Sequence, residues 1–179
     1  IKVKAEPKDL ENVKSYQLFF GRYLLFFVMG QLQALIIVLG DIYILHCQIL
    51  YPGWFWLVAS LASVTFTLLI YSLALSFGDV GKALAVVIMV IQIAGSGGTF
   101  PIELLPAVYR NIYIFFPFPY AINAMRETIG GMYGSDYMKN LAELMIFAVV
   151  GLLIGLVIRI PFVKLNHFVE KRMEDTKMM

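Results

Sequence analysis

Residues 54–77 read WFWLVASLASVTFTLLIYSLALSF, an apolar stretch without a charged side chain. As an α-helix it would extend about 36 Å at 1.5 Å per residue, enough to cross roughly 30 Å of hydrocarbon. The whole chain is 60% hydrophobic and only 15% charged, whereas soluble domains are roughly 45–50% apolar. The sequence therefore predicts an integral membrane protein built from helices.

Further apolar segments lie on both sides of this stretch. One covers about residues 23–47 and is separated from residues 54–77 by a turn at 50–53 that contains Pro and Gly. Another covers residues 83–98, and its regular helix is expected to break in the glycine-rich run at its end. The last covers about residues 141–160. We therefore expect about four transmembrane spans.

The segment between the third and fourth spans, residues 99–131, is apolar but is interrupted by prolines and charges. Irregular backbone cannot face lipid, because each unpaired amide in hydrocarbon costs several kcal/mol. We interpret this segment as a re-entrant pair of short helices. The predicted fold is thus an all-α integral membrane protein with about four transmembrane helices plus a re-entrant helical hairpin before the last span.

The basic residues indicate how the chain is oriented. They gather before the first span, at Lys2, Lys4, Lys8, Lys14 and Arg22, and after the last, at Arg159, Lys164, Lys171, Arg172 and Lys177. Because cytoplasmic flanks carry the excess of Lys and Arg, both termini are predicted to be cytoplasmic. Residues 1–22 then form a cytoplasmic or interfacial segment, and residues 161–179 form a cytoplasmic tail. The net charge of +2 gives no indication of nucleic-acid binding.

The sequence begins at Ile1 without an initiator Met or an apolar signal-peptide core, so we expect a piece of a longer protein. Catalysis within the chain is not expected. The run 78–83, GDVGKA, places two residues between its glycines where a phosphate-binding loop needs four, and a tight cytoplasmic turn explains it better. His46 and Cys47 are adjacent and point in different directions, so neither a metal site nor a cofactor is predicted.

Four polar side chains within the spans are candidates for a substrate path. They are Gln31, Gln33, Asp41 and Gln92. A carboxylate in an apolar span usually faces a partner or a water-filled cavity, although Asp41 lies close enough to the end of its span for interfacial water to hydrate it. The glutamines could line a polar path or form hydrogen bonds between helices.

Gly151 and Gly155 form a small-xxx-small pair on the last span. Such a pair lets another helix backbone approach closely. Packing within the bundle and dimerisation both fit the pattern.

The run GGTFPIELLP at residues 97–106, followed by FFPFPYA at 115–121 and by Arg126, resembles the C-terminal signature of ABC-2-type permeases. Its re-entrant motif comprises Gly97, Gly98, Pro101, Glu103, Pro106, Pro117, Pro119 and Arg126. Within that superfamily the chain is most similar to the YhgE/Pip (phage infection protein) group, through matching features at residues 20–23, 30–31 and 40–41.

The resemblance implies that these are the last four spans of a six-span unit in a bacterial plasma membrane. It also implies a homodimer or larger complex that rests on a cytosolic ATPase through a coupling helix. Residues 8–16 would supply that helix, with Lys8, Glu11 and Lys14 as candidate contacts. The group's large extracellular domain, linked to phage adsorption and type VII secretion, is not in this sequence.

These observations lead to two hypotheses about function. The first is the membrane permease part of an ABC-2-type transporter, with export favoured over import and with membrane lipid and an ATPase subunit as partners. The second is a non-transporting membrane anchor, or a secretion-complex or phage-receptor subunit, that holds an external domain for recognition.

Overall fold

The computed structural model describes residues 15–98 and 111–158, and every regular element in these two ranges is a helix. In order, the elements are α1 (Ser15–Leu39), the π-helical turn η2 (Gly40–Ile44), α2 (Pro52–Gly95), the 3₁₀ turn η4 (Tyr113–Phe115), α4 (Pro117–Gly130), α5 (Asp136–Leu153) and the π-helical turn η5 (Ile154–Ile158). Three stretches are long and apolar enough to cross a membrane: Tyr16–Ile44, Pro52–Ile93 and Asp136–Val157. The predicted all-α membrane fold is confirmed for the described residues.

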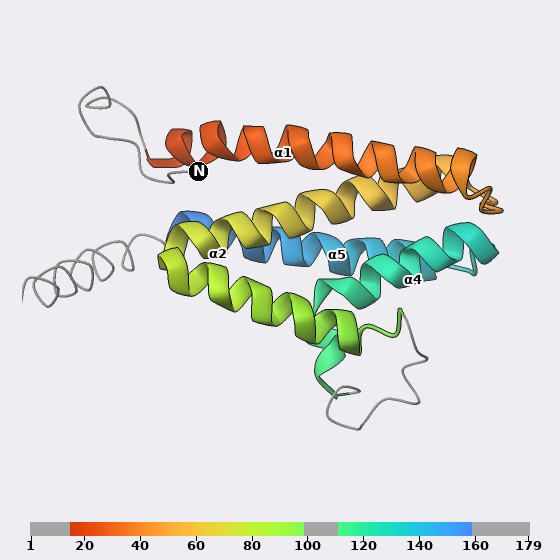
Figure 1. Cartoon of the computed structure of the whole chain (residues 1–179). Coiled ribbons are helices and arrows are strands. Elements are labelled where there is room, and N and C mark those ends of the chain that lie inside the picture. Colours follow the sequence, from red (N-terminus) through yellow and green to blue (C-terminus); the bar gives the residue numbers. More distant parts are fainter. Residues whose placement is uncertain (1–14, 99–110, 159–179) are drawn as a thin grey trace, which may run out of the picture.

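The long helix α2 is bent back on itself at Gly78 (Figure 1). Gly78 has φ 61° and ψ −131°, a conformation that side-chain-bearing residues rarely adopt. The bend divides α2 into a first arm, residues 52–77, and a second arm, residues 79–95, which run in opposite directions. A Cβ atom added at Gly81 would lie 2.0 Å from the backbone oxygen of Leu73, so the arms meet here at backbone contact.

An exposed ion pair sits on the outside of this bend. The ammonium of Lys82 donates to Asp79 Oδ1 at 2.7 Å. The reversal of the chain at Gly78 and the exposed Asp79–Lys82 pair fit the prediction of a tight turn at residues 78–83.

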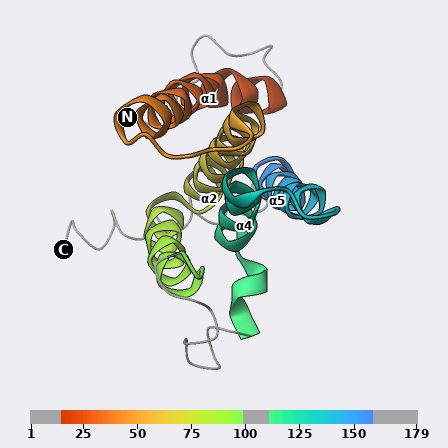
Figure 2. The same ribbon diagram turned by 90° about the vertical axis from the view of Figure 1, so that its right-hand side faces the viewer.

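The first arm of α2 lies at the centre of the bundle, with α1, α4 and α5 packed around it (Figure 2). On the α1 side, Phe19, Tyr23 and Tyr71 form a buried aromatic cluster. The Tyr71 hydroxyl donates to the backbone oxygen of Phe19 at 3.1 Å, and the Tyr23 hydroxyl donates to that of Val64 at 3.2 Å. The two helices are therefore joined by packing and by hydrogen bonds that lipid cannot replace.

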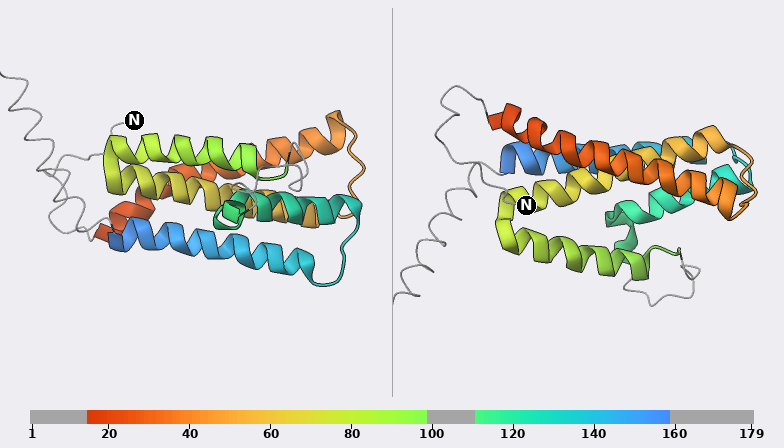
Figure 3. Two further views of the ribbon diagram at one scale, coloured as in Figure 1. Left: turned by 90° about the horizontal axis from the view of Figure 1, so that it is seen from below. Right: turned by 45° about the horizontal axis from the view of Figure 1, so that its top comes forward.

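The beginning of α1 and the end of η5 meet at the same end of the bundle as the bend in α2 (Figure 3). A Cβ at Gly155 would lie 2.3 Å from Phe19 Cε2 and 2.6 Å from Ser72 Oγ. The Ser76 hydroxyl donates to the backbone oxygen of Ile154 at 3.1 Å. Gly155 thus allows α1, the first arm and η5 to share one tight contact.

The helices extend beyond the apolar segments from which they were predicted. Helix α1 begins at Ser15 rather than near residue 23, and α5 begins at Asp136 rather than near residue 141. Hydropathy marks the part of a helix that sits in hydrocarbon, whereas the helix itself can continue into the hydrated interface. The second arm begins directly after Gly78, and its helix ends at Gly95, where the glycine-rich run begins.

We predict that Gly81→Ala destabilises the bundle by about 1–3 kcal/mol, because the added methyl group overpacks against the Leu73 backbone. Thermal unfolding in detergent, followed by tryptophan fluorescence, measures this change. Gly21→Ala is the matched control, since nothing lies within 4 Å of its Cβ position and helix propensity alone favours Ala there. Equal melting temperatures for the two variants would contradict the contact.

Candidate functional site

The four candidates for a polar path do not gather in one place. Gln31 and Gln33 lie on α1, Asp41 is half-buried in η2 at the far end of that helix, and Gln92 is buried in the second arm. None of the four side chains forms a hydrogen bond with another among the described residues. Each is therefore considered in its own surroundings.

Gln31 is bound to the first arm of α2 at both ends of its amide. Its Nε2 donates to the backbone oxygen of Ser60 at 3.1 Å, and the Ser60 hydroxyl donates to Gln31 Oε1. The neighbouring Gly30 allows this approach, since a Cβ there would lie 2.7 Å from Ser63 Oγ. In contrast, the Gln33 side chain is exposed on the bundle surface. These contacts favour a helix-joining role for Gln31.

Gln92 is the one of the four whose side chain is buried with an unsatisfied atom in the described part of the chain. Its side chain is only 4% exposed, and its Oε1 has no hydrogen-bond partner within the described ranges. Ser72 Oγ, on the first arm, is the other buried side-chain atom in this state. An unsatisfied buried polar group costs about 1–3 kcal/mol. Each arm of α2 therefore carries one polar group able to accept or donate a further hydrogen bond.

The described part of the re-entrant motif joins the end of the second arm to α4. Gly97 has φ 73°, so it takes the left-handed conformation common after a helix end. Arg126 Nη2 on α4 donates to the Gly97 backbone oxygen at 2.6 Å. The positive charge of Arg126 is also stabilised at this position, because the C-terminal end of a helix carries the negative end of the helix dipole. Gly98 lies against Ile122 of α4, with its Cβ position 3.0 Å from Ile122 Cδ1.

The two described prolines of the motif, Pro117 and Pro119, are buried in the first turn of α4. There a proline removes no helix hydrogen bond, because the first amides of a helix have no acceptor within it. Pro101, Glu103 and Pro106 lie outside the described residues. So do the coupling candidates Lys8, Glu11 and Lys14.

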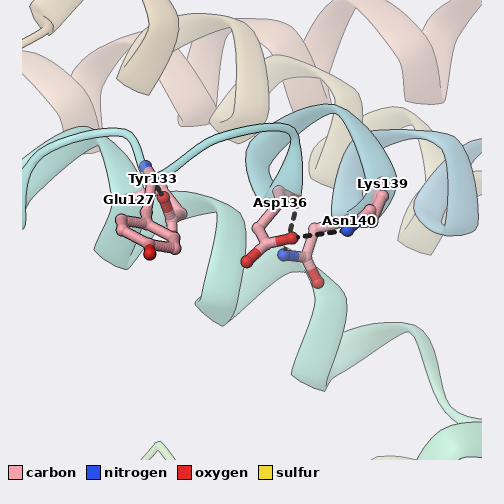
Figure 4. A network of polar contacts seen from close by, with 5 residues as sticks. All are labelled: Glu127, Tyr133, Asp136, Lys139 and Asn140. Atoms are coloured by element: carbon pink, nitrogen blue, oxygen red, sulfur yellow. Dashed lines mark hydrogen bonds and ion pairs between the residues drawn. The ribbon is translucent and has the colours of Figure 1, made fainter.

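A polar pocket of about 400 Å³ lies between α4 and the first turns of α5. It was not predicted from the sequence. The residues lining it are Asn123, Arg126, Glu127, Asp136, Lys139 and Asn140. Figure 4 shows part of its network: Lys139 Nζ donates to Asp136 Oδ1 at 2.7 Å, and the Tyr133 backbone N–H donates to Glu127 Oε2 at 2.6 Å. The sequence signal that could have indicated this pocket is the helical spacing of polar residues in α4 and in the first turns of α5.

Residues 12–157 match the family described as ABC-2 family transporter protein. The chain belongs to the ABC-2 transporter family. It is also 31% identical over 163 residues to Uncharacterized protein YhgE of Bacillus subtilis (strain 168), in an alignment that covers 90% of this chain and 20% of that protein. No solved structure matches the chain.

The family match and the identity to the Bacillus protein confirm the resemblance to ABC-2-type permeases and to the YhgE/Pip group. The chain spans about one fifth of the length of its Bacillus relative.

Within residues 15–98 and 111–158, no group of three or more His, Cys, Asp or Glu side chains is arranged to hold a metal ion.

We predict that Gln31→Leu lowers stability by about 1–3 kcal/mol, because it leaves the Ser60 hydroxyl without its partner across the α1–α2 contact. Gln33→Leu is the matched control on the same helix, and its exposed side chain gives no reason for a loss. Thermal melting of both variants in detergent makes the comparison. A stable Gln31→Leu protein with reduced transport would instead identify Gln31 as part of a path.

Proposed function

We propose that this chain is the membrane permease part of an ABC-2-type transporter and crosses the membrane four times. The crossings are α1 with η2, the first arm, the second arm, and α5 with η5. The second arm, residues 79–95, is roughly 26 Å long at 1.5 Å per residue, close to the hydrocarbon thickness of roughly 30 Å. Family membership is consistent with this role.

The observation that carries this topology is the contact between the two ends of the described chain. Phe19, in the first turns of α1, lies against Gly155 of η5. The start of α1 and η5 lie at the end of the bundle where α2 bends (Figure 3). Ends that meet on one side of a membrane require an even number of crossings. With the excess of basic residues before α1 and after η5, that side is proposed to be the cytoplasm.

Helix α4 is proposed to be re-entrant. Its 14 residues extend about 21 Å, too short for roughly 30 Å of hydrocarbon. Its first turn is buried within the bundle, and its far end is joined to the start of α2 through the Tyr51 backbone N–H, which donates to the Thr128 oxygen at 3.1 Å. Such an element can enter the membrane and return without placing unpaired backbone in lipid.

Transport is proposed to occur between two copies of the chain, with export as the direction that the family resemblance favours. The N-terminal segment, with Lys8, Glu11 and Lys14, would receive the movement of a cytosolic ATPase. The second arm supplies a face for lipid or for the second copy, since Val80, Val86 and Val90 are each more than half exposed. Gln92, on the same arm, is the path candidate whose unused hydrogen-bonding atom is buried within the described bundle.

The second hypothesis, a non-transporting anchor or a secretion-complex or phage-receptor subunit, is kept for one reason. The Bacillus relative is about five times longer than the matched region, which leaves room for a large external domain. Such a protein would need the bundle only as a stable support.

Four crossings predict that Cys47 is outside the cell and Lys82 inside. Cys47 is exposed in the connection between η2 and α2. In a full-length protein whose only cysteine is Cys47, a membrane-impermeant maleimide should label intact cells. With Cys47→Ala and Lys82→Cys, labelling should require permeabilised cells. The reverse pattern, or labelling of both in intact cells, would refute this topology.

The permease proposal predicts that the full-length protein co-purifies with an ATPase and that combined Lys8→Glu and Lys14→Glu substitutions release it. Reversed charge should weaken a contact made by the N-terminal segment. Lys139→Glu, at the opposite end of the bundle, is the control and should retain the partner. Absence of any ATPase under mild solubilisation would favour the anchor hypothesis.

A further inference from the structure

The polar pocket between α4 and α5 differs in kind from the rest of the bundle surface. All of its lining residues are charged or carry an amide: Asn123, Arg126, Glu127, Asp136, Lys139 and Asn140. Its volume of about 400 Å³ lies within the roughly 300–1,000 Å³ typical of small-molecule sites. It thus combines the size of a binding site with two cations and two carboxylates.

The charged groups retain bonding capacity toward the pocket. A guanidinium has five N–H donors, and Arg126 uses its Nη2 for the Gly97 oxygen. Lys139 uses one of three donors for Asp136, and Glu127 uses Oε2 for the Tyr133 backbone N–H. Within the described part of the chain, these groups can therefore hold one another in place and still bind a ligand.

The proposed membrane placement, on which this step rests, puts the pocket at the depth of lipid headgroups. The span Asp136–Val157 has 22 residues, about 33 Å of helix, so its first turn falls at the edge of the hydrocarbon. Exposed aromatic rings surround this end of the bundle, with Tyr133 80% exposed and Trp54 41% exposed. Tyr and Trp are enriched at this level of a membrane. The nearest abundant ligands are therefore phospholipid headgroups.

We propose that this pocket binds the headgroup of an aminophospholipid, an ammonium–phosphate zwitterion of the phosphatidylethanolamine type. The phosphate is placed by Arg126 and Lys139, and the ammonium by Glu127 and Asp136. A purely anionic headgroup would gain the two cations but would also face the two carboxylates, whereas a zwitterion satisfies both signs. The proposal does not depend on transport activity.

Native mass spectrometry of the purified full-length protein in detergent tests this site. Phosphatidylethanolamine and phosphatidylglycerol are titrated separately, and bound lipid is counted. We expect phosphatidylethanolamine to bind about tenfold more tightly, the factor expected for one charge-assisted hydrogen bond. Glycerophosphoethanolamine, which lacks acyl chains, is added as a competitor. Competition only at much higher concentration than the lipid assigns the site to a lipid, and competition at equal concentration overturns that assignment in favour of a soluble zwitterion.

Two substitutions test separately the contacts proposed for the phosphate and for the ammonium of the headgroup. Lys139→Gln should weaken binding of phosphatidylethanolamine about tenfold. Glu127→Gln, which keeps an acceptor for the Tyr133 amide, should reduce the preference over phosphatidylglycerol. Lys82→Gln is the matched control, because Lys82 and Lys139 each pair with an aspartate three residues earlier at 2.7 Å. Equal affinity for both lipids, or an equal loss in Lys82→Gln, would overturn the proposal.

Discussion

Close contact with the first arm of α2 is the constraint on which the bundle depends. Within lipid, apolar side chains gain little by leaving one hydrocarbon surface for another, so helices associate through close packing and hydrogen bonds. At Gly30 and at Gly155 the neighbouring helix lies so close to the arm that a Cβ would collide with it. The atoms it would meet are the hydroxyls of Ser63 and Ser72, respectively. Hydrogen bonds from Tyr23, Ser60, Tyr71 and Ser76 then join side chains of one helix to backbone or side chains of the next. The arm contacts α1, α4 and α5, and it takes part in each of these hydrogen bonds.

The sequence could predict what is local and not what depends on partners. An uninterrupted apolar run predicts a helix in the membrane because each residue adds to the hydrophobicity of the segment independently of the fold. The glycine pair at 78 and 81 predicts a turn because the conformational freedom of glycine is also a local property. The spacing of Gly151 and Gly155 predicts close approach but does not name the neighbour, which in the structure includes Leu69 and Phe19. The partner of Gln31 and the Arg126–Gly97 bond join residues 29 apart in sequence. No local pattern contains that information.

The polar residues of the bundle divide into those that are satisfied and those that are not. Both ends of the Gln31 amide form hydrogen bonds with Ser60, so binding a substrate through Gln31 would require these bonds to break. Gln92 and Ser72 are buried with an unused atom each, one on either arm of α2. A protein retains such groups against a cost of about 1–3 kcal/mol apiece, and their cost falls if another arrangement of the helices gives them partners.

The two ends of the second arm are held differently, and this limits how it can move. At the bend, Gly81 lies against the Leu73 backbone with no space for a Cβ, and neither arm can separate there without losing the turn itself. At the opposite end, the described contacts include a hydrogen bond from Arg126 to the Gly97 oxygen and the packing of Gly98 on Ile122. A contact of this kind can be exchanged for one with water or with a ligand at small net cost, whereas backbone packing cannot. The polar pocket shares Arg126 with the hydrogen bond that joins the Gly97 end of the second arm to α4, so a ligand that binds Arg126 would compete with that bond.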